Sequence, residues 1–186
     1  STTWWSSAAT ASSVLIGSAL PFREDQDSVL GPTSVPRWSY ALSKMLDEHL
    51  AFAYCRQKGL PTVAVRYFNA YGPRLDARGY GSVVARLITQ ALDGEPLTLY
   101  GDGSQTRAFT YVTDTVRGTI AALEYTAAPE RAEGGRSFNI GSGRAISIAE
   151  LAHLVRDLSG ADVPITHIPF DAAYGANYEE TQHRRP

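Results

Sequence analysis

A tyrosine and a lysine four residues apart, Tyr40 and Lys44, are the side chains of this sequence best suited to chemistry. Residues with this spacing lie on one face of an α-helix, one turn apart. A phenol ordinarily loses its proton near pH ~10, and a nearby ammonium group favours the ionised form. Such a pair can remove the proton of an alcohol while the alcohol is oxidised. The bare pattern Y-x-x-x-K is also common as a simple surface pair, so its context decides between the two interpretations.

The context favours an enzyme. The flanking segments are Phe22-Arg-Glu-Asp25, Leu30-Gly-Pro-Thr33, Arg37-Trp-Ser-Tyr-Ala-Leu-Ser-Lys44 and Val65-Arg-Tyr-Phe-Asn-Ala-Tyr-Gly-Pro-Arg74. In their order and spacing they resemble the extended short-chain dehydrogenase/reductase family, in its nucleotide-sugar epimerase, dehydratase and decarboxylase branch. The resemblance extends from about residue 12 to residue 186. It implies an enzyme that uses NAD and acts on a nucleotide sugar.

The composition restricts the class of protein further. A chain of 186 residues, 44% hydrophobic and 19% charged, fits a soluble globular protein with one domain or two small lobes. The net charge of -2 gives no electrostatic reason for nucleic-acid binding. We find no run of the ~20 apolar residues that a membrane span needs and no signal peptide, so we expect a cytoplasmic location. Neither the single cysteine, Cys55, nor the four histidines have the spacing of metal ligands.

The hydrophobic pattern predicts an α/β fold. A buried strand is expected at residues 13–16, a helix at 39–58 that ends at Gly59, and a buried strand at 62–68. Strand, crossover helix and strand form a βαβ unit. Further along, we expect helices at 82–92, at 113–125 and from Ser147, where Glu150 completes a capping box, and strands at 97–100, 108–112 and 163–168.

These elements predict the C-terminal part of a Rossmann-type doubly wound parallel sheet at residues 1–75. A smaller mixed α/β lobe for the nucleotide sugar is expected at residues 76–186. A Rossmann fold needs a glycine-rich turn, G-x-G-x-x-G, whose backbone amides meet the pyrophosphate of the cofactor. The sequence contains no such motif before Tyr40. We therefore expect a chain from which the glycine-rich N-terminal half is absent and whose C-terminal end is truncated.

The resemblance also implies roles for individual residues. Tyr40 is expected to be the catalytic base, Lys44 to hold the nicotinamide ribose, and Ser12 to complete the hydrogen-bond relay to the substrate alcohol. The backbone of Tyr67 is expected at the nicotinamide. The implied substrate contacts are Ser13, Asn69 at the phosphate or sugar, Thr98 and Tyr100 at the uracil, Arg107 at the diphosphate, and Arg184 at a phosphate or the sugar. A bidentate guanidinium is well suited to phosphate oxygens.

Residue 14 bears on the reaction. Decarboxylases of this branch have a glutamate two residues after the catalytic Ser or Thr, and dehydratases an Asp-Glu pair, whereas this chain has Ser13-Val14. An apolar side chain cannot relay a proton. We therefore expect epimerisation at C4 of a UDP-hexose or UDP-uronic acid through a 4-keto intermediate, with NAD as a retained cofactor. A decarboxylase, a 4,6-dehydratase and a non-catalytic sugar-nucleotide-binding protein stay open as alternatives.

The resemblance implies partners as well. The family often dimerises by a four-helix bundle that includes the tyrosine-bearing helix, so we expect a homodimer through residues 39–58. The small-molecule partner is a nucleotide sugar, with a UDP-sugar favoured. Nucleic acid, membrane and metal are not expected as partners.

Overall fold

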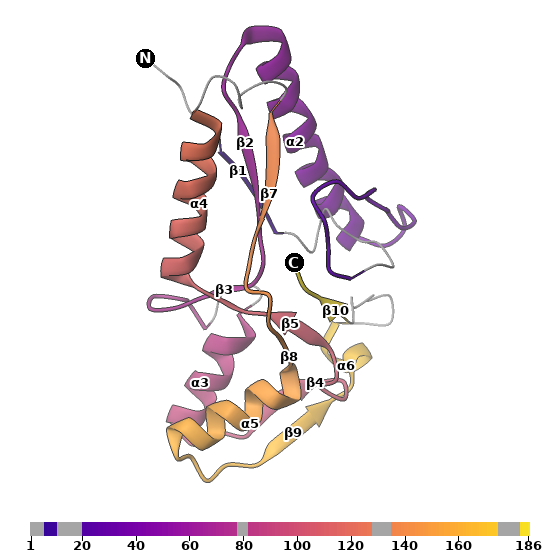
Figure 1. Ribbon diagram of the computed structural model, residues 1–186. Helices are drawn as coiled ribbons and strands as arrows, with labels where there is room; N and C mark the ends of the chain where they lie inside the picture. The colour runs from indigo at the N-terminus through magenta and orange to yellow at the C-terminus, as the bar shows by residue number, and fades with distance from the viewer. Residues whose placement is uncertain (1–5, 11–19, 78–81, 128–134, 175–182) are drawn as a thin grey trace.

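The computed structural model places a parallel sheet flanked by helices above a second, smaller lobe (Figure 1). It describes residues 6–10, 20–77, 82–127, 135–174 and 183–186. The sheet has the strand order β1-β2-β7, and both pairings are parallel. Its strands are β1 (Ser6–Thr10), β2 (Val63–Tyr67) and β7 (Arg136–Ile140). The expected fold class, a parallel α/β sheet with a smaller mixed lobe, is therefore confirmed.

Helix α2 (Arg37–Lys58) joins β1 to β2 and completes the predicted βαβ unit. It ends where the sequence indicates, because Gly59 adopts a left-handed conformation with φ 64° and its amide donates to the Cys55 carbonyl. The helix begins at Arg37, two residues before the expected start, directly after Pro36. The strand expected at residues 13–16 lies outside the described residues, and β1 lies earlier in the chain.

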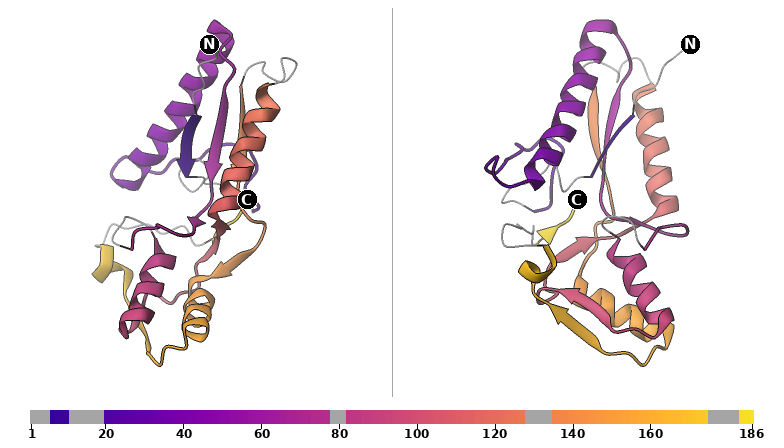
Figure 2. Two further views of the ribbon diagram at one scale, coloured as in Figure 1. Left: turned by 90° about the vertical axis from the view of Figure 1, so that its left-hand side faces the viewer. Right: turned by 180° about the vertical axis from the view of Figure 1, so that it is seen from behind.

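The two faces of the sheet are covered by different helices (Figures 1 and 2). On one face, Ala122 and Leu123 of α4 (Val112–Ala127) pack against Val63 and Val65 of β2. Side chains alternate along a strand, so the intervening residues of β2 face α2. The first four side chains of β2 are buried, as expected for a parallel sheet covered on both faces, and Tyr67 at its carboxyl end is half-buried.

The second lobe has its own hydrophobic core. Helices α3 (Val83–Asp93) and α5 (Ile148–Ser159) contact each other and pack beside the parallel strands β4 (Leu97–Tyr100) and β9 (Ile165–Ile168). The largest fully buried side chains of this core are Leu87, Leu97 and Leu99. The predicted capping box of α5 is confirmed: the Ser147 hydroxyl accepts from the Glu150 amide at 3.0 Å, and the Glu150 carboxylate accepts from the Ser147 amide at 2.7 Å.

Several very short strands were not predicted. They are β3 (Ala70–Tyr71), β8 (Ala145–Ser147) and β10 (His183–Arg184), and the five-residue helix α6 (Phe170–Tyr174) was also missed. Where a single strand was expected at 108–112, the structure has two, β5 (Thr106–Ala108) and β6 (Thr110–Tyr111). The chain divides at Phe109 because β5 pairs with β8 and β10, whereas β6 pairs with β3.

The chain passes between the lobes several times. After β2 it leaves the sheet to form α3 and β4, returns through α4 and β7, and then builds α5 and β9 (Figure 1). Residues 112–127 and 136–140 therefore pack with the first sheet, although they lie beyond the boundary expected at residue 75. The C-terminal residues lie between the lobes, where β10 pairs with β5 and the Phe22 amide donates to the Arg185 carbonyl (Figure 2). No helix in the described part of the chain has the length and apolar character to cross a membrane.

Candidate active site

The first turns of α2 carry the predicted tyrosine and lysine at the carboxyl edge of the sheet. A crossover helix begins near the carboxyl end of the strand before it, and ligands of open α/β sheets bind outside that edge. Tyr40 is 49% exposed, and the Lys44 ammonium lies 5.8 Å from the centroid of its ring. A hydrogen bond from Lys44 Nζ to Asp47 Oδ2, at 2.9 Å, raises the pKa of Lys44 above its ordinary value. The ammonium beside the phenol is therefore charged at neutral pH.

The residues that follow β2 lie at the same edge. The Phe68 amide donates to the Ile140 carbonyl at 2.9 Å, and the Asn69 carbonyl accepts from the Thr110 amide at 3.0 Å. The Tyr67 hydroxyl lies 3.1 Å from Thr119 Oγ1, so this side chain points toward α4. The backbone at residues 67–69 is thus held rigidly at the edge, and it is the backbone of Tyr67 for which a cofactor contact was predicted.

Side chains of α3 cover one edge of β4. The Thr98 amide donates to Gln90 Oε1 and the Thr98 carbonyl accepts from Arg86 Nη2, both at 3.1 Å. The Arg86 guanidinium also lies 4.2 Å from the centroid of the Tyr100 ring. Neither Arg86 nor Gln90 was predicted as a site residue, although a polar pair four residues apart on an apolar helix is a visible signal. The backbone of Thr98, predicted to meet a base, is engaged by this helix.

Tyr100 has polar neighbours with unused hydrogen-bonding capacity. Its carbonyl accepts from Gln105 Nε2 at 3.1 Å, and Gln105 is only 6% exposed. Gln105 Oε1 and Arg86 Nε are buried and have no hydrogen-bond partner within the described residues. A buried acceptor and a buried donor without partners are costly unless a ligand or water satisfies them.

Two arginines are brought together by the short strand β10. In the parallel pairing with β5, Arg184 lies directly opposite Arg107. The pairing is supported by a 2.9 Å contact between Thr106 Oγ1 and His183 Nδ1, 77 residues further along the chain. Arg107 is 7% exposed, and its Nη1 donates to the Thr106 carbonyl at 2.8 Å. Like charges directly opposite each other are destabilising, so this arrangement favours an anion.

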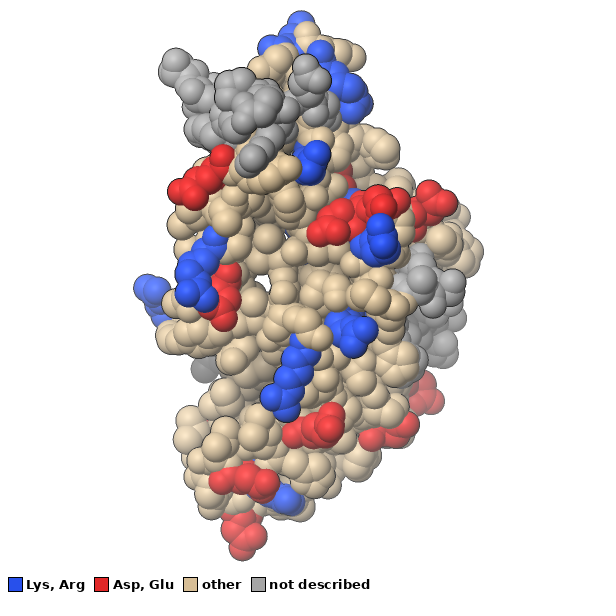
Figure 3. Space-filling view, in the orientation of Figure 1, with Lys and Arg blue, Asp and Glu red and all other residues tan. Residues whose placement is uncertain are grey.

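The positive charge at this position comes from particular residues rather than from a broad basic surface (Figure 3). On the face shown in Figure 3, Lys and Arg side chains are interspersed with Asp and Glu side chains. No large patch of one sign covers this face. Among the residues that the structure describes, no group of three His, Cys, Asp or Glu side chains could hold a metal ion.

Part of the predicted site lies beyond what can be described. Ser12, Ser13 and Val14 fall within residues 11–19, which are outside the described residues. Of the other predicted residues, Tyr40 and Lys44 lie together on α2, and Arg107 and Arg184 lie together across β5 and β10. Asn69 follows β2, on the chain that leads to the second lobe.

The fold and this edge define a class of protein: an α/β protein of the Rossmann type with a Tyr-Lys pair at the carboxyl edge of its parallel sheet. The chain belongs to the NAD-dependent epimerase/dehydratase family, whose family model matches residues 6–141. Membership of this family confirms the resemblance inferred from the motifs around Tyr40.

Similar proteins carry out different reactions. A UDP-N-acetyl-alpha-D-glucosaminuronate decarboxylase of Bacillus cytotoxicus is 46% identical over 166 residues, which are 89% of this chain and 50% of the relative. A UDP-glucuronic acid 4-epimerase of Bacillus cereus, solved with NAD, is 32% identical with a TM-score of 0.72, over 96% of this chain and 50% of that structure. A UDP-N-acetylglucosamine 4-epimerase of Methanobrevibacter ruminantium, solved with UDP-N-acetylmuramic acid, is 25% identical with a TM-score of 0.79, over 97% of this chain and 52% of that structure. The chain thus spans about half the length of these relatives.

The residues present fit one end of the family's cofactor. A phenol and an ammonium group on one helix turn provide hydrogen-bonding groups for the hydroxyls of a ribose, and they lie at the sheet edge where dinucleotides bind. The glycine-rich turn that binds a pyrophosphate is not found in these 186 residues. The described residues therefore fit the nicotinamide ribose, and no pyrophosphate site is assigned within them.

The pair of arginines predicts how a diphosphate binds. Replacement of Arg107 by Lys should weaken the binding of UDP to the full-length protein by at least about tenfold, because a buried bidentate donor becomes a single point charge. Isothermal titration calorimetry measures this affinity. Arg117→Lys is the matched control, since the Arg117 side chain on α4 is 79% exposed, and its affinity should equal that of the wild type. Equal affinities for all three proteins would remove Arg107 from the phosphate site.

Proposed function

We propose that the protein containing this chain catalyses NAD-dependent epimerisation at C4 of a nucleotide sugar, most favourably a UDP-hexose or UDP-uronic acid. The observation that carries the proposal is the Tyr40-Lys44 pair. A charged ammonium lies 5.8 Å from an exposed phenol ring, at the carboxyl edge of a parallel sheet. This is the arrangement that an alcohol-oxidising base requires.

Tyr40 and Lys44 have different roles in the proposed reaction. Tyr40 takes the proton of the C4 hydroxyl and later returns it, while the cation of Lys44 stabilises the phenolate and binds the ribose of the cofactor. NAD, when bound, supplies reversible acceptance of the C4 hydride. Ser12 donates a hydrogen bond to the substrate oxygen in this proposal, and Ser13 contacts the sugar. Epimerisation follows when the oxidised sugar presents its other face before it is reduced again.

Residues of the second lobe and the chain leading to it hold the nucleotide. Arg107 and Arg184 bind the diphosphate, a role supported by their opposed positions in β5 and β10. The base lies at Tyr100 and Thr98, and the unused groups of Arg86 and Gln105 provide a donor and an acceptor beside Tyr100. Asn69 contacts the sugar or its phosphate from the chain after β2.

Decarboxylation of a nucleotide uronic acid is the second candidate. It is favoured by the 46% identity to a decarboxylase over 166 residues. Val14 argues against decarboxylation, because the position two residues after Ser12 then has no carboxylate or other proton-transferring group. A 4,6-dehydration is less favoured for the same reason, since it needs acidic residues in the Ser13-Val14 pair.

A homodimer through α2 is part of the proposal. Leu42, Leu46 and Leu50 follow one another at intervals of one helical turn, and each is about half exposed, with 55%, 54% and 48% of its surface accessible. Tyr54 continues this stripe at 56% exposure. A regular apolar stripe on a helix that already packs on the sheet by its other face suits helix pairing with a second copy of the chain.

Loss of the base should abolish turnover. In Tyr40→Phe the full-length protein should lose about 10²–10⁴-fold in kcat, because only a proton acceptor is removed. Binding of the nucleotide sugar should stay close to that of the wild type. Tyr54→Phe is the control, since it removes an exposed phenol from the same helix and should leave kcat unchanged. A Tyr40→Phe variant with more than about a tenth of the wild-type kcat would contradict the assignment.

The reaction itself can be distinguished with UDP-glucuronic acid and NAD⁺. An epimerase should convert this substrate into its C4 epimer and release no carbon dioxide, because Val14 cannot assist loss of the carboxylate. NMR spectroscopy identifies the sugar product, and a radiolabelled carboxylate reports any carbon dioxide. Release of labelled carbon dioxide with formation of a pentose would establish decarboxylation and reject our interpretation of residue 14.

The proposed dimer can be tested by charging the apolar stripe. Leu46→Glu should convert a dimer into a monomer in sedimentation equilibrium, because it places a carboxylate in the centre of the helix pair. Leu92→Glu, at a site on α3 that is 75% exposed, should leave the molecular mass unchanged. A monomeric wild-type protein, or a dimer that survives Leu46→Glu, would argue against pairing through α2.

A further inference from the structure

An arginine in the central strand of the sheet pairs with α2. Arg66 of β2 and Glu48 of α2 are each only 6% exposed. Arg66 Nε donates to Glu48 Oε1 at 2.8 Å and Nη2 donates to Oε2 at 2.7 Å. Removing two charges from water is costly, and apolar side chains of similar volume often stabilise a fold as well or better. Stability alone does not explain why β2 carries a charge here.

The pair fixes the rotation of α2 about its own axis. Glu48 lies one turn after Lys44 and two turns after Tyr40, so the three side chains share one stripe of the helix. A bidentate contact between a guanidinium and a carboxylate is satisfied in only a narrow range of orientations. Once Glu48 is held on Arg66, the direction in which Tyr40 and Lys44 project is set as well.

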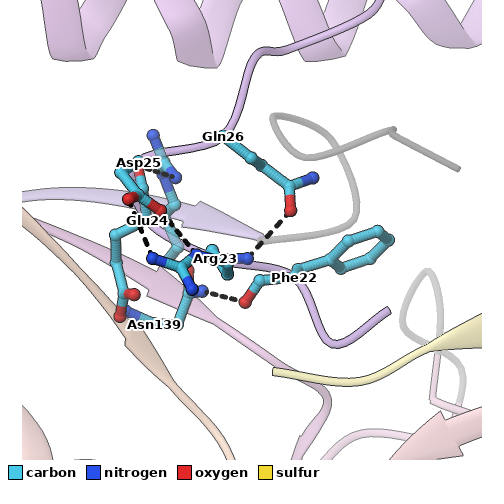
Figure 4. Close-up of polar contacts among 7 residues, drawn as sticks. Phe22, Arg23, Glu24, Asp25, Gln26 and Asn139 are labelled. Carbon is cyan, nitrogen blue, oxygen red and sulfur yellow. Dashed lines mark hydrogen bonds and ion pairs between the residues drawn. The ribbon is translucent and has the colours of Figure 1, made fainter. Parts of the chain in front are cut away.

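The same guanidinium reaches a third part of the chain. Arg66 Nη1 lies 3.4 Å from the carbonyl oxygen of Glu24, in the segment 22–26. The Glu24 carboxylate accepts from the backbone amide of Asn139 at 2.9 Å, and the Asn139 side chain donates to the Phe22 carbonyl at 2.8 Å (Figure 4). Asn139 is the residue of β7 that lies directly opposite Arg66. Two neighbouring strands thus bind this segment through adjacent polar side chains.

The segment continues from the sheet edge to the beginning of α2. Phe22 packs on Phe68, the residue after β2, with their ring centroids 6.3 Å apart. Further along, Gly31 lies so close to Trp38 in the first turn of α2 that a Cβ atom on Gly31 would lie 2.1 Å from the indole nitrogen. The chain that leads into the helix is therefore fixed at both ends.

We infer that Arg66 is a positioning residue: through Glu48 it orients the Tyr40-Lys44 face of α2, and through Glu24 it holds segment 22–26 in place at the carboxyl edge. This inference rests on the proposed function for its effect on turnover. Its structural part, the ordering of α2 and of segment 22–26 by one guanidinium, is independent of the reaction.

The deciding variant replaces both partners by apolar side chains of similar length. E48M/R66M leaves no unpaired charge, so the full-length protein should keep the melting temperature of the wild type or exceed it. Its kcat should nevertheless fall by at least about tenfold, because small displacements of a catalytic group are costly. The KM for the nucleotide sugar should change by less than about twofold, since Arg107 and Arg184 are untouched. A merely structural pair would be replaced without this loss of kcat.

Two further variants complete the experiment. R66K keeps a cation for Glu48 but lacks the rigid planar fork of N–H donors of a guanidinium, so it should fold and show a reduced kcat with unchanged KM. R23M is the matched control, because Arg23 belongs to the same segment and pairs with Asp25 at 2.9 Å, but its side chain is 72% exposed. It should behave as the wild type in every measurement.

Hydrogen exchange of backbone amides gives a readout that does not need activity. Exchange should become faster in residues 22–26 and 37–44 of E48M/R66M and R66K and stay unchanged in R23M. Wild-type kcat in a stably folded E48M/R66M protein would overturn the inference, and if that variant does not fold, wild-type kcat in R66K would do so. If the wild type turns over no nucleotide sugar, the proposed function fails, and unchanged exchange in both segments of R66K would then overturn the positioning role separately.

Discussion

Enclosure of strand β2 on both faces is the constraint on which the rest of the molecule depends. A strand between two layers of helices has no access to water, so each of its side chains must either pack or find a polar partner. Val63 and Val65 satisfy this condition by packing on α4, and Arg66 satisfies it by pairing with Glu48. The two helices that flank the sheet are therefore attached to β2 by different kinds of interaction. On the α4 side, apolar packing is joined by one hydrogen bond between Tyr67 and Thr119, whereas on the other side a bidentate ion pair holds α2 in one orientation.

The site combines this rigid edge with groups from the second lobe. The Tyr40-Lys44 turn belongs to the helix held by Arg66, and the opposed arginines belong to β5 and β10. Contacts of the C-terminal residues connect the two regions: His183 contacts Thr106, and the Arg185 carbonyl accepts from the Phe22 amide. A nucleotide sugar that extends from the arginines to Tyr40 would thus touch both lobes along its length. In this arrangement the bound phosphates would set the distance between the sugar and Tyr40, the proposed catalytic base.

Local signals in the sequence were sufficient for the long elements. The apolar pattern and Gly59 predicted α2 nearly to its ends, and the Ser147-Glu150 spacing predicted the capping box of α5. The strands of two or three residues could not be predicted, because β3, β5 and β10 exist only through partners distant in the sequence. The motif around Tyr40 was sufficient for the family, whereas the proposed choice between reactions rests on residues 12–14, which lie outside the described residues.

The buried pair illustrates a different limit of prediction. The signal was present, since Arg66 interrupts an apolar strand and Glu48 continues the Tyr40-Lys44 stripe. The sequence could not predict that Arg66 and Glu48 pair with each other, because either side chain could have faced water. The same holds for Arg86 and Gln90, which are ordinary surface residues by composition and prove to bind the backbone of Thr98.

The neighbouring strands β2 and β7 are not consecutive in the chain, and this bears on the order of folding. Val63 of β2 pairs with Arg136 of β7. Between these strands the chain forms α3 and β4 of the second lobe, and α4 then returns to the sheet. During synthesis β2 cannot pair with β7 until the whole segment between them has left the ribosome, whereas the local helix α2 can form earlier. Long-range parallel pairing of this kind raises the contact order and slows folding. Until α4 and β7 have been made, the valines of β2 lack their cover, and exposed apolar strands of this kind are prone to aggregation.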